Sequence, residues 1–281
     1  MLILNNPEEL RAQCKDWHRQ GAEIALVPTM GYYHEGHQKL IETGRKLGQK
    51  LVTTLFVNPA QFGPNEDLAS YPRDLQRDAA IAEKAGTDIL FAPEADSMYA
   101  EDHATWVEVP DMGRPLCGQS RPIHFRGVCT IVLKLLMLSG ADKAVFGEKD
   151  WQQQAILKRM ARDLNLDVQI VTVPTVREND GLAMSSRNVY LSAEERALAP
   201  HIYKGLQYTK GLYQSGERNA QHLKQATLAY WSKTIPAARL DYLAIVDPET
   251  LENLDILAEN GLMACALRLG HARLIDNIIL K

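Results

Sequence analysis

Several features that mark common protein classes are scarce or missing in this chain of 281 residues. The four cysteines, Cys14, Cys117, Cys129 and Cys265, form no Cys-x-x-Cys pair, so neither a zinc cluster nor a disulfide framework is expected. The longest strongly apolar run, residues 131–138, is far shorter than the roughly 20 residues that span a bilayer. The N-terminus lacks the basic segment of a secretory signal. We therefore expect a soluble cytoplasmic protein with no membrane partner.

Excess positive charge is also missing. The chain has 31 Lys and Arg against 35 Asp and Glu, a formal net charge of −4, so no nucleic-acid partner is expected. Hydrophobic residues make up 46% of the chain, which excludes a largely disordered protein. Neither a Gly-x-x-x-x-Gly-Lys-Ser/Thr loop nor a Gly-x-Ser-x-Gly elbow occurs. These absences argue against a P-loop NTPase and an α/β-hydrolase.

What the chain does contain, over its first 175 residues, is an alternation of short apolar segments and helical segments. The predicted strands cover residues 23–28, 51–57, 88–91, 143–146 and 168–173, and the predicted helices cover residues 7–19, 36–47, 72–85, 127–138 and 151–164. This alternation predicts βαβ units and an α/β fold with a Rossmann-like, doubly wound parallel sheet.

The pattern changes after about residue 175. A capping box at Ser192–Glu195 opens a long predicted helix, and a second helix is expected over residues 219–233. Predicted strands follow at residues 242–246, 262–269 and 272–280. We therefore expect one domain of residues 1–175 and a second, smaller α+β domain of residues 176–281 that closes over the site.

The first candidate site segment follows the first buried strand and contains Met30, Gly31, His34 and His37. Ligands of open α/β sheets bind at this carboxyl edge, and N–H groups at a helix start attract phosphate. Two histidines three residues apart share one face of a helical turn and can stabilise charge on phosphate oxygens. A capping histidine or half of a metal site would give the same pattern, so the residues alone leave these alternatives open.

Two more segments follow strands at the same predicted edge. Asn58 and Gln61 suit a small substrate with hydroxyl and carboxylate groups, although this segment taken alone fits a plain loop with an Asx turn better. Lys149 can hold phosphate as a point charge, and Gln153 would face the same crevice from the next helix. Asp150 fits a helix N-cap better than a catalytic role.

A loop just past the domain boundary contains Met184, Ser185, Ser186 and Arg187. Two hydroxyls and a guanidinium can surround a polyphosphate, and such a loop can close over a site between domains. A serine-rich surface loop is the alternative. Arg126, which precedes an apolar helix, either binds an anion or pairs with an acidic neighbour.

In combination, these segments resemble the pantothenate synthetase (pantoate–β-alanine ligase) family over nearly the whole chain. The resemblance rests on residues 28–31 with 34–37, 56–59 with 61–62, 71–73, 124–127, 146–150, 185–188 and 273–277, in this order. The His-x-Gly-His element also resembles the nucleotidylyl-transferase superfamily.

The resemblance implies an ATP-dependent ligase with two steps. The carboxylate of (R)-pantoate attacks the α-phosphate of ATP, which gives pantoyl adenylate and pyrophosphate. The amine of β-alanine then attacks the acyl carbon, which gives pantothenate and AMP. No covalent bond to the enzyme is needed, so positioning and charge stabilisation should dominate catalysis. The implied partners are pantoate, β-alanine and ATP, with Mg²⁺ as a cofactor and a homodimer as the assembly.

The resemblance also implies roles for single residues, with His37 as the proton donor and Asp78 as a carboxylate associated with magnesium. The implied catalytic groups are His37, His34, Lys149 and Arg187. The implied ATP-binding residues are Met30, Gly31, His34, His37, Gly147, Glu148, Lys149, Asp150, Val176, Met184, Ser185, Ser186 and Arg187. The implied substrate contacts are Gln61, Gln153, Asn58 and Arg126.

The chain departs from the family pattern at Tyr32, Tyr33 and Trp151, which leaves the shape of the crevice near the nucleotide open. Two other functions compete with the ligase. An adenylyl- or cytidylyltransferase of the same superfamily would stop at a stable nucleotidyl product. A non-catalytic nucleotide-binding module would lack some of the phosphate-contacting groups, whereas His34, His37, Lys149 and Arg187 are all present.

Overall fold

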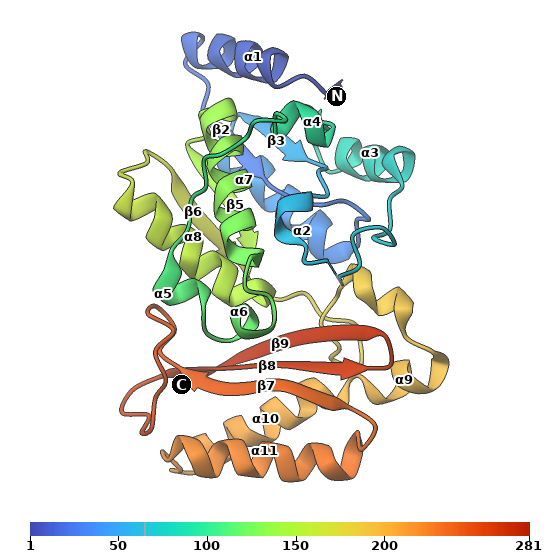
Figure 1. Cartoon of the computed structure of the whole chain (residues 1–281), viewed down its shortest axis with the longest axis vertical. Coiled ribbons are helices and arrows are strands. Elements are labelled where there is room, and N and C mark those ends of the chain that lie inside the picture. Colours follow the sequence, from blue (N-terminus) through green and yellow to red (C-terminus); the bar gives the residue numbers. More distant parts are fainter. Residues whose placement is uncertain (65) are drawn as a thin grey trace.

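The computed structural model describes residues 1–64 and 66–281, and it contains two β-sheets that follow one another along the long axis of the molecule (Figure 1). The larger sheet has the strand order β1-β4-β3-β2-β5-β6, with parallel pairing throughout. The smaller sheet is antiparallel, with the order β7-β8-β9. The predicted α/β class, with a parallel sheet and a smaller α+β part, is confirmed.

The elements around the parallel sheet have the following bounds. The strands are β1 (Leu2–Leu4), β2 (Ile24–Val27), β3 (Lys50–Thr54), β4 (Ile89–Phe91), β5 (Lys143–Gly147) and β6 (Gln169–Val173). The helices are α1 (Pro7–Arg19), α2 (Glu35–Leu47), α3 (Leu75–Lys84), α4 (Ala95–Met98), α5 (Pro110–Gly113), α6 (Cys117–Ser120), α7 (His124–Ser139) and α8 (Trp151–Asp163), with the 3₁₀ turns η1 (Pro59–Gln61) and η2 (Glu148–Asp150).

The C-terminal part begins with the 3₁₀ turn η3 (Ser186–Tyr190). Its helices are α9 (Ala193–Leu198), α10 (His201–Gln214) and α11 (Ala220–Thr234), and its strands are β7 (Arg239–Val246), β8 (Gly261–Leu269) and β9 (Ala272–Leu280). The boundary predicted at residues 175 and 176 falls in the connection after β6. Whether the two parts fold as independent units stays a prediction.

The order of the parallel sheet reverses at β2. The chain runs outward through β3 and β4 on one side of β2, and then through β5 and β6 on the other. Crevices form outside the carboxyl ends of the strands at such a reversal. The loops after β2 and β5 are therefore brought together, and these loops carry the predicted phosphate-binding residues.

Both faces of the small sheet are covered, because β8 is buried along most of its length. Leu262 and Ala264 pack into the core of the parallel-sheet part. Met263 and Cys265, which alternate with them, pack into a second core that includes residues of α10 and α11. Figure 1 shows these two helices on the far side of the sheet from the parallel-sheet part.

Two local predictions were wrong. The long helix expected after the capping box is two helices, because Pro200 follows α9 and a helix interior does not accommodate proline. The capping box itself, between Ser192 and Glu195, is present. The first strand, β1, was missed because its three residues are too few to show a pattern. In the described part of the chain, no helix is long and apolar enough to cross a membrane.

Candidate active site

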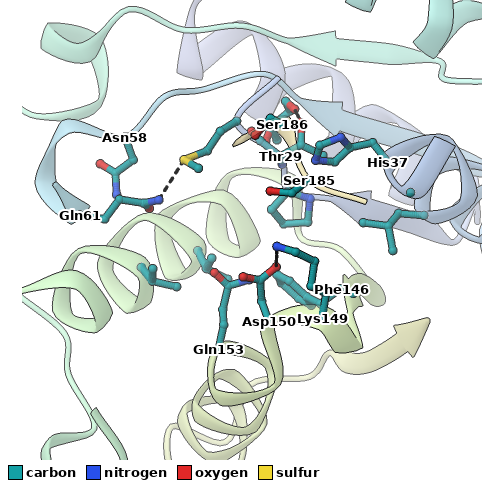
Figure 2. A pocket seen from close by; sticks show the side chains of 18 of the residues that line it. Thr29, His37, Asn58, Gln61, Phe146, Lys149, Asp150, Gln153, Ser185 and Ser186 are labelled. Carbon is teal, nitrogen blue, oxygen red and sulfur yellow. Dashed lines mark hydrogen bonds and ion pairs between the residues drawn. The ribbon is translucent and has the colours of Figure 1, made fainter. Parts of the chain in front are cut away.

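A cavity of about 210 Å³ lies at the carboxyl edge of the parallel sheet. Loops that follow β2, β3, β5 and β6 line it together with α7 and η3. Among the predicted site residues, the cavity is lined by Met30, His34, His37, Asn58, Gln61, Gly147, Lys149, Asp150, Gln153, Val176, Met184, Ser185, Ser186 and Arg187. Figure 2 shows Asn58 and Gln61 at one end of this space, with Lys149 and Asp150 across from His37.

His34 and His37 lie together at the N-terminus of α2, with ring centroids 4.0 Å apart. The N–H of Gly36 donates to Nδ1 of His34 at 3.1 Å, and the N–H of His34 faces Nδ1 of His37 at 3.4 Å. Because Nδ1 is the acceptor in each neutral ring, the proton is carried by Nε2. Each imidazole therefore offers an Nε2–H donor to an anionic ligand.

Burial favours the neutral form of both rings. Burial, with a smaller contribution from Lys149, lowers the pKa of His34 to about 4. Burial, followed by the charges of His34 and Lys149, lowers the pKa of His37 well below its usual value. An approaching polyphosphate would raise both pKa values, because opposite charge favours the protonated ring.

The loop after β2 passes through a turn with positive φ at Gly31 (92°) and Tyr32 (53°). Fully buried Asp78, on α3, accepts hydrogen bonds from the N–H groups of Tyr32 at 2.5 Å and Tyr33 at 2.7 Å. A Cβ at Gly31 would lie 3.0 Å from Oδ2 of Asp78. Asp78 therefore anchors the turn that leads into the two histidines. Gly31 itself shapes the turn and is not among the lining residues.

The magnesium role predicted for Asp78 does not fit this geometry. Asp78 is not among the cavity-lining residues, and its two oxygens already accept backbone hydrogen bonds. Burial raises the pKa of this carboxyl, which weakens it further as a cation ligand. Within residues 1–64 and 66–281, no group of three or more His, Cys, Asp or Glu side chains is arranged to hold a metal.

The other end of the cavity is built on η1. The side-chain amide of Asn58 donates to Oε1 of Gln61 at 3.2 Å and to the carbonyl of Gly127 at 3.1 Å. Nε2 of Gln61 contacts Sδ of Met30 at 2.9 Å. A thioether is a weak acceptor, so a carboxylate or hydroxyl oxygen would be a better partner for this amide. Gln153 lines the same cavity from α8.

Helix α7 approaches η1 closely at Gly127, where a Cβ would collide with the carbonyl of Ala60. The prediction that Arg126 contacts substrate does not fit, because its guanidinium lies over Trp106 at 4.8 Å and outside the cavity lining. On α7, positions 124, 128, 131, 132 and 135 line the cavity. A residue two positions after His124 points to the opposite side of a helix, so Arg126 lies on the face of α7 that turns away from the cavity.

Arg121 and His124 line the cavity and were missed as site residues by the sequence reasoning. Nδ1 of His124 lies 3.0 Å from the carbonyl oxygen of Gln61, and Arg121 donates to Nε2 of His124 at 3.1 Å. Burial lowers the pKa of His124 well below its usual value. The neutral ring, with its proton on Nδ1, therefore fixes the end of η1.

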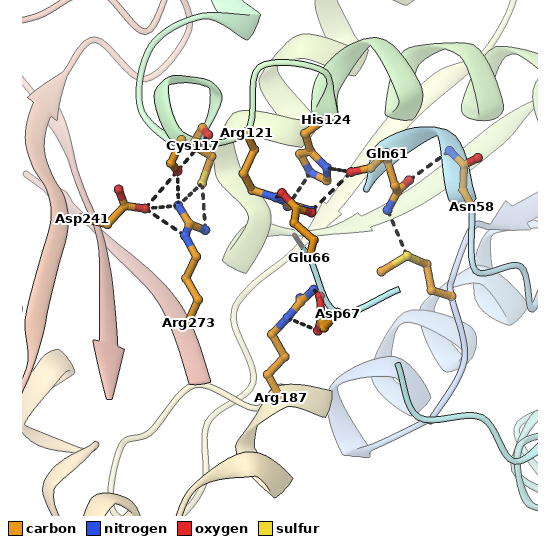
Figure 3. A network of polar contacts seen from close by, with 12 residues as sticks. Asn58, Gln61, Glu66, Asp67, Cys117, Arg121, His124, Arg187, Asp241 and Arg273 are labelled. Carbon is orange, nitrogen blue, oxygen red and sulfur yellow. Dashed lines mark hydrogen bonds and ion pairs between the residues drawn. The ribbon is translucent and has the colours of Figure 1, made fainter. Parts of the chain in front are cut away.

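Two ion pairs join the walls of the site. Arg121 pairs with Glu66 at 2.6 Å, and Arg187 pairs with Asp67 at 3.0 Å (Figure 3). A neighbouring cavity of about 320 Å³ shares Lys149 and both arginines with the first, and residues of β8 and β9 line its other side. The two cavities therefore adjoin one another at these three side chains.

Two of the predicted ATP-binding segments are joined by a short hairpin. The N–H of Met184 donates to the carbonyl of Val176 at 3.0 Å, and Arg177 and Ala183 form an antiparallel bridge. Glu148, which was also predicted to bind ATP, is not among the lining residues. Its carboxylate accepts a hydrogen bond from the hydroxyl of Thr172 at 3.2 Å.

Comparisons with known proteins agree over the full length of the chain. The family described as pantoate-beta-alanine ligase matches residues 2–279. A pantothenate synthetase from Desulfovibrio desulfuricans is 64% identical over 280 residues, which cover 100% of this chain and 99% of the relative. The crystal structure of pantothenate synthetase from Thermus thermophilus has a TM-score of 0.93 at 44% identity, with 99% of each chain covered. That of the Francisella tularensis ligase, complexed with beta-gamma ATP and beta-alanine, has a TM-score of 0.81 at 30% identity and covers 100% of this chain and 98% of its own.

Proposed function

The chain belongs to the pantoate–β-alanine ligase family, and from the geometry of its cavity we propose how its residues carry out that family's reaction. The reaction is the ATP-dependent condensation of pantoate with β-alanine through pantoyl adenylate. A carboxylate oxygen of pantoate bonds to the α-phosphorus as the bond to pyrophosphate breaks. The β-alanine nitrogen then bonds to the acyl carbon as AMP leaves. The adenylyl- and cytidylyltransferase alternative and the non-catalytic binding module do not fit this family.

The observation that supports the site assignment is that His34, His37, Lys149 and Arg187 line one cavity at the reversal point of the sheet. We assign the phosphates of ATP to this group. The Nε2–H groups of the two histidines donate to phosphate oxygens, while the ammonium and the guanidinium offset the charge that grows on the leaving pyrophosphate. Val176 and Met184 lie beside them and suit the adenosine part.

We assign pantoate to the opposite end, at Asn58, Gln61 and Gln153. The amide of Gln61 donates to an oxygen of pantoate in place of its contact with Met30. His124 and Arg121 hold the backbone carbonyl of Gln61, and this contact fixes the residue that carries the side-chain amide. The acid is then aligned with the α-phosphorus by fixed neutral donors, which is the positioning that a reaction without a covalent enzyme intermediate requires.

Three further features complete the proposal. Magnesium arrives with the phosphates of ATP, because the protein side chains offer no matched ligand set in the described residues, and no step is assigned to a protein-held ion. Residues 176–281 act as a unit that closes over the site. The chain works in the cytoplasm as a homodimer. Sedimentation equilibrium, which measures the mass of the assembly in solution, tests the dimer.

The experiment is an assay of AMP release with ATP, in which pantoate or β-alanine is omitted in turn. The ligase releases AMP at a sustained rate only with both acids present. Pantoate alone supports exchange of labelled pyrophosphate into ATP, which reports the first step. AMP release that is independent of pantoate would contradict the assignment, and His222→Gln, on the exposed surface of α11, serves as a control variant.

A further inference from the structure

Strand β9 carries a polar pair that the reaction described above does not use. Asp276 and Asn277 are only 4% and 8% exposed, although most of their neighbours on β9 are apolar. Successive side chains of a strand point to opposite faces, so the two residues contact different parts of the molecule. Both contacts lead to segments that line the cavity.

Asn277 holds the turn that carries Lys149. Its side-chain nitrogen donates to the carbonyl oxygens of Glu148 at 2.9 Å and Lys149 at 3.0 Å. A side-chain amide has two N–H donors, and both are used here. The backbone of η2 is therefore fixed from the small sheet, while the Lys149 side chain lines the cavity from the same turn.

Asp276, on the other face of β9, holds the segment that leads to Arg187. Its carboxylate accepts from both terminal nitrogens of Arg177 at 2.7 and 2.8 Å. The guanidinium of Arg177 also lies 3.4 Å from the ring centroid of Tyr203. Arg177 lies in the hairpin that joins Val176 to Met184, so one strand supports both cationic segments of the site.

We propose that Asn277 is a positioning residue that sets the place of Lys149 in the cavity, and thereby the rate of adenylate formation. This inference rests on the proposed function of Lys149. Asn277 itself lines the neighbouring cavity, but the proposed role requires no contact with a substrate. Asn277 acts by fixing two carbonyl groups, and a displacement of about 1 Å in such a site costs on the order of 100-fold in rate.

Two variants test the inference. Asn277→Asp keeps the shape and replaces the donating nitrogen with an oxygen that repels the two carbonyls, and Asn277→Ala removes the donors without adding charge. The rate of pantoate-dependent pyrophosphate exchange, measured well below the unfolding temperature, is expected to fall about 10- to 100-fold in both. The KM for pantoate is expected to change less than about 3-fold, because Asn58 and Gln61 are not supported by β9. Asn260→Asp, at an exposed position before β8, is the matched control for the added charge.

A double-mutant cycle with Lys149→Ala separates positioning from general destabilisation. If Asn277 acts through Lys149, Asn277→Ala slows exchange less than about 3-fold once Lys149 is already alanine. An undiminished further loss in the double variant would overturn the inference, as would wild-type exchange in both Asn277 variants. A wild-type rate in Lys149→Ala itself would instead remove Lys149 from the proposed site, and with it the basis of this inference.

Discussion

The guanidinium of Arg187 is paired side-on with the carboxylate of Asp67, with Nε and Nη2 each 3.0 Å from a carboxylate oxygen. Each side chain is 24% exposed. If Arg187 binds the phosphates of ATP, the nucleotide and Asp67 compete for the same planar group of donors. The carboxylate then occupies the position of a phosphate until the nucleotide arrives.

Replacing Asp67 with asparagine should therefore tighten ATP binding. The Asp67→Asn variant removes the competing charge, and we expect the Kd for ATP to fall about 3- to 10-fold, with a loss of about 1–2 kcal/mol in the free energy of unfolding without nucleotide. Calorimetric titration with ATP and urea denaturation measure the two quantities. Asp111→Asn, at an almost fully exposed carboxylate, controls for the change in net charge. Weaker ATP binding in Asp67→Asn would mean that Asp67 holds Arg187 in its binding position.

His37→Ala should separate catalysis from binding. The imidazole is proposed to act mainly as charge develops on the phosphates, so we expect kcat for pyrophosphate exchange to fall about 10²- to 10⁴-fold. The Kd for ATP should change only a few-fold. Exchange kinetics and calorimetric titration measure these quantities on the same preparation. Equal losses in rate and affinity would show that the ring binds ATP without a special role in the transition state.

The buried imidazoles should make stability fall in mild acid. The pKa of His34 is about 4 in the folded chain against about 6.5 in an unfolded one. The unfolded state therefore takes up a proton first as the pH falls, and the stabilisation present above pH 6.5 is lost towards pH 4. Urea denaturation at pH 7, 6 and 5 should show this decrease, and His34→Gln should reduce it. An unchanged pH dependence in His34→Gln would exclude His34 as its source.

Gly31→Ala tests the turn that Asp78 anchors. The backbone of Gly31 has a positive φ, which disfavours any residue with a side chain. A Cβ added at this position would also lie only 3.0 Å from Oδ2 of Asp78. We expect a loss of about 1–3 kcal/mol in the free energy of unfolding. Gly211→Ala, in helix α10 with open space around its Cβ position, should instead stabilise the protein by about 0.5–1 kcal/mol. Thermal and urea denaturation measure the stability of both variants. Equal stability of Gly31→Ala and Gly211→Ala would contradict the anchoring role of Asp78.

Much of the site could be predicted from the sequence because its residues follow strands. Residues placed directly after β2, β3 and β5 lie at one edge of a parallel sheet wherever those strands pair, so His37, Gln61 and Lys149 were predictable from local pattern. Arg121 and His124 could not be found this way. Arg121 precedes α7 and His124 is its first residue, and their contact with the carbonyl of Gln61 depends on the close approach of α7 to η1 at Gly127.

The amino-acid order by itself determined the alternation of strands and helices, the family, and the segments that bear the chemistry, because apolar periodicity and short motifs are local properties. Only the tertiary structure decided that Arg126 turns away to Trp106, that Asp78 binds backbone N–H groups of the first loop, and that Asn277 reaches the turn of Lys149. Those outcomes depend on which elements pack together over separations of 20 to 128 residues. No pattern within one segment encodes the direction of a side chain across such a contact.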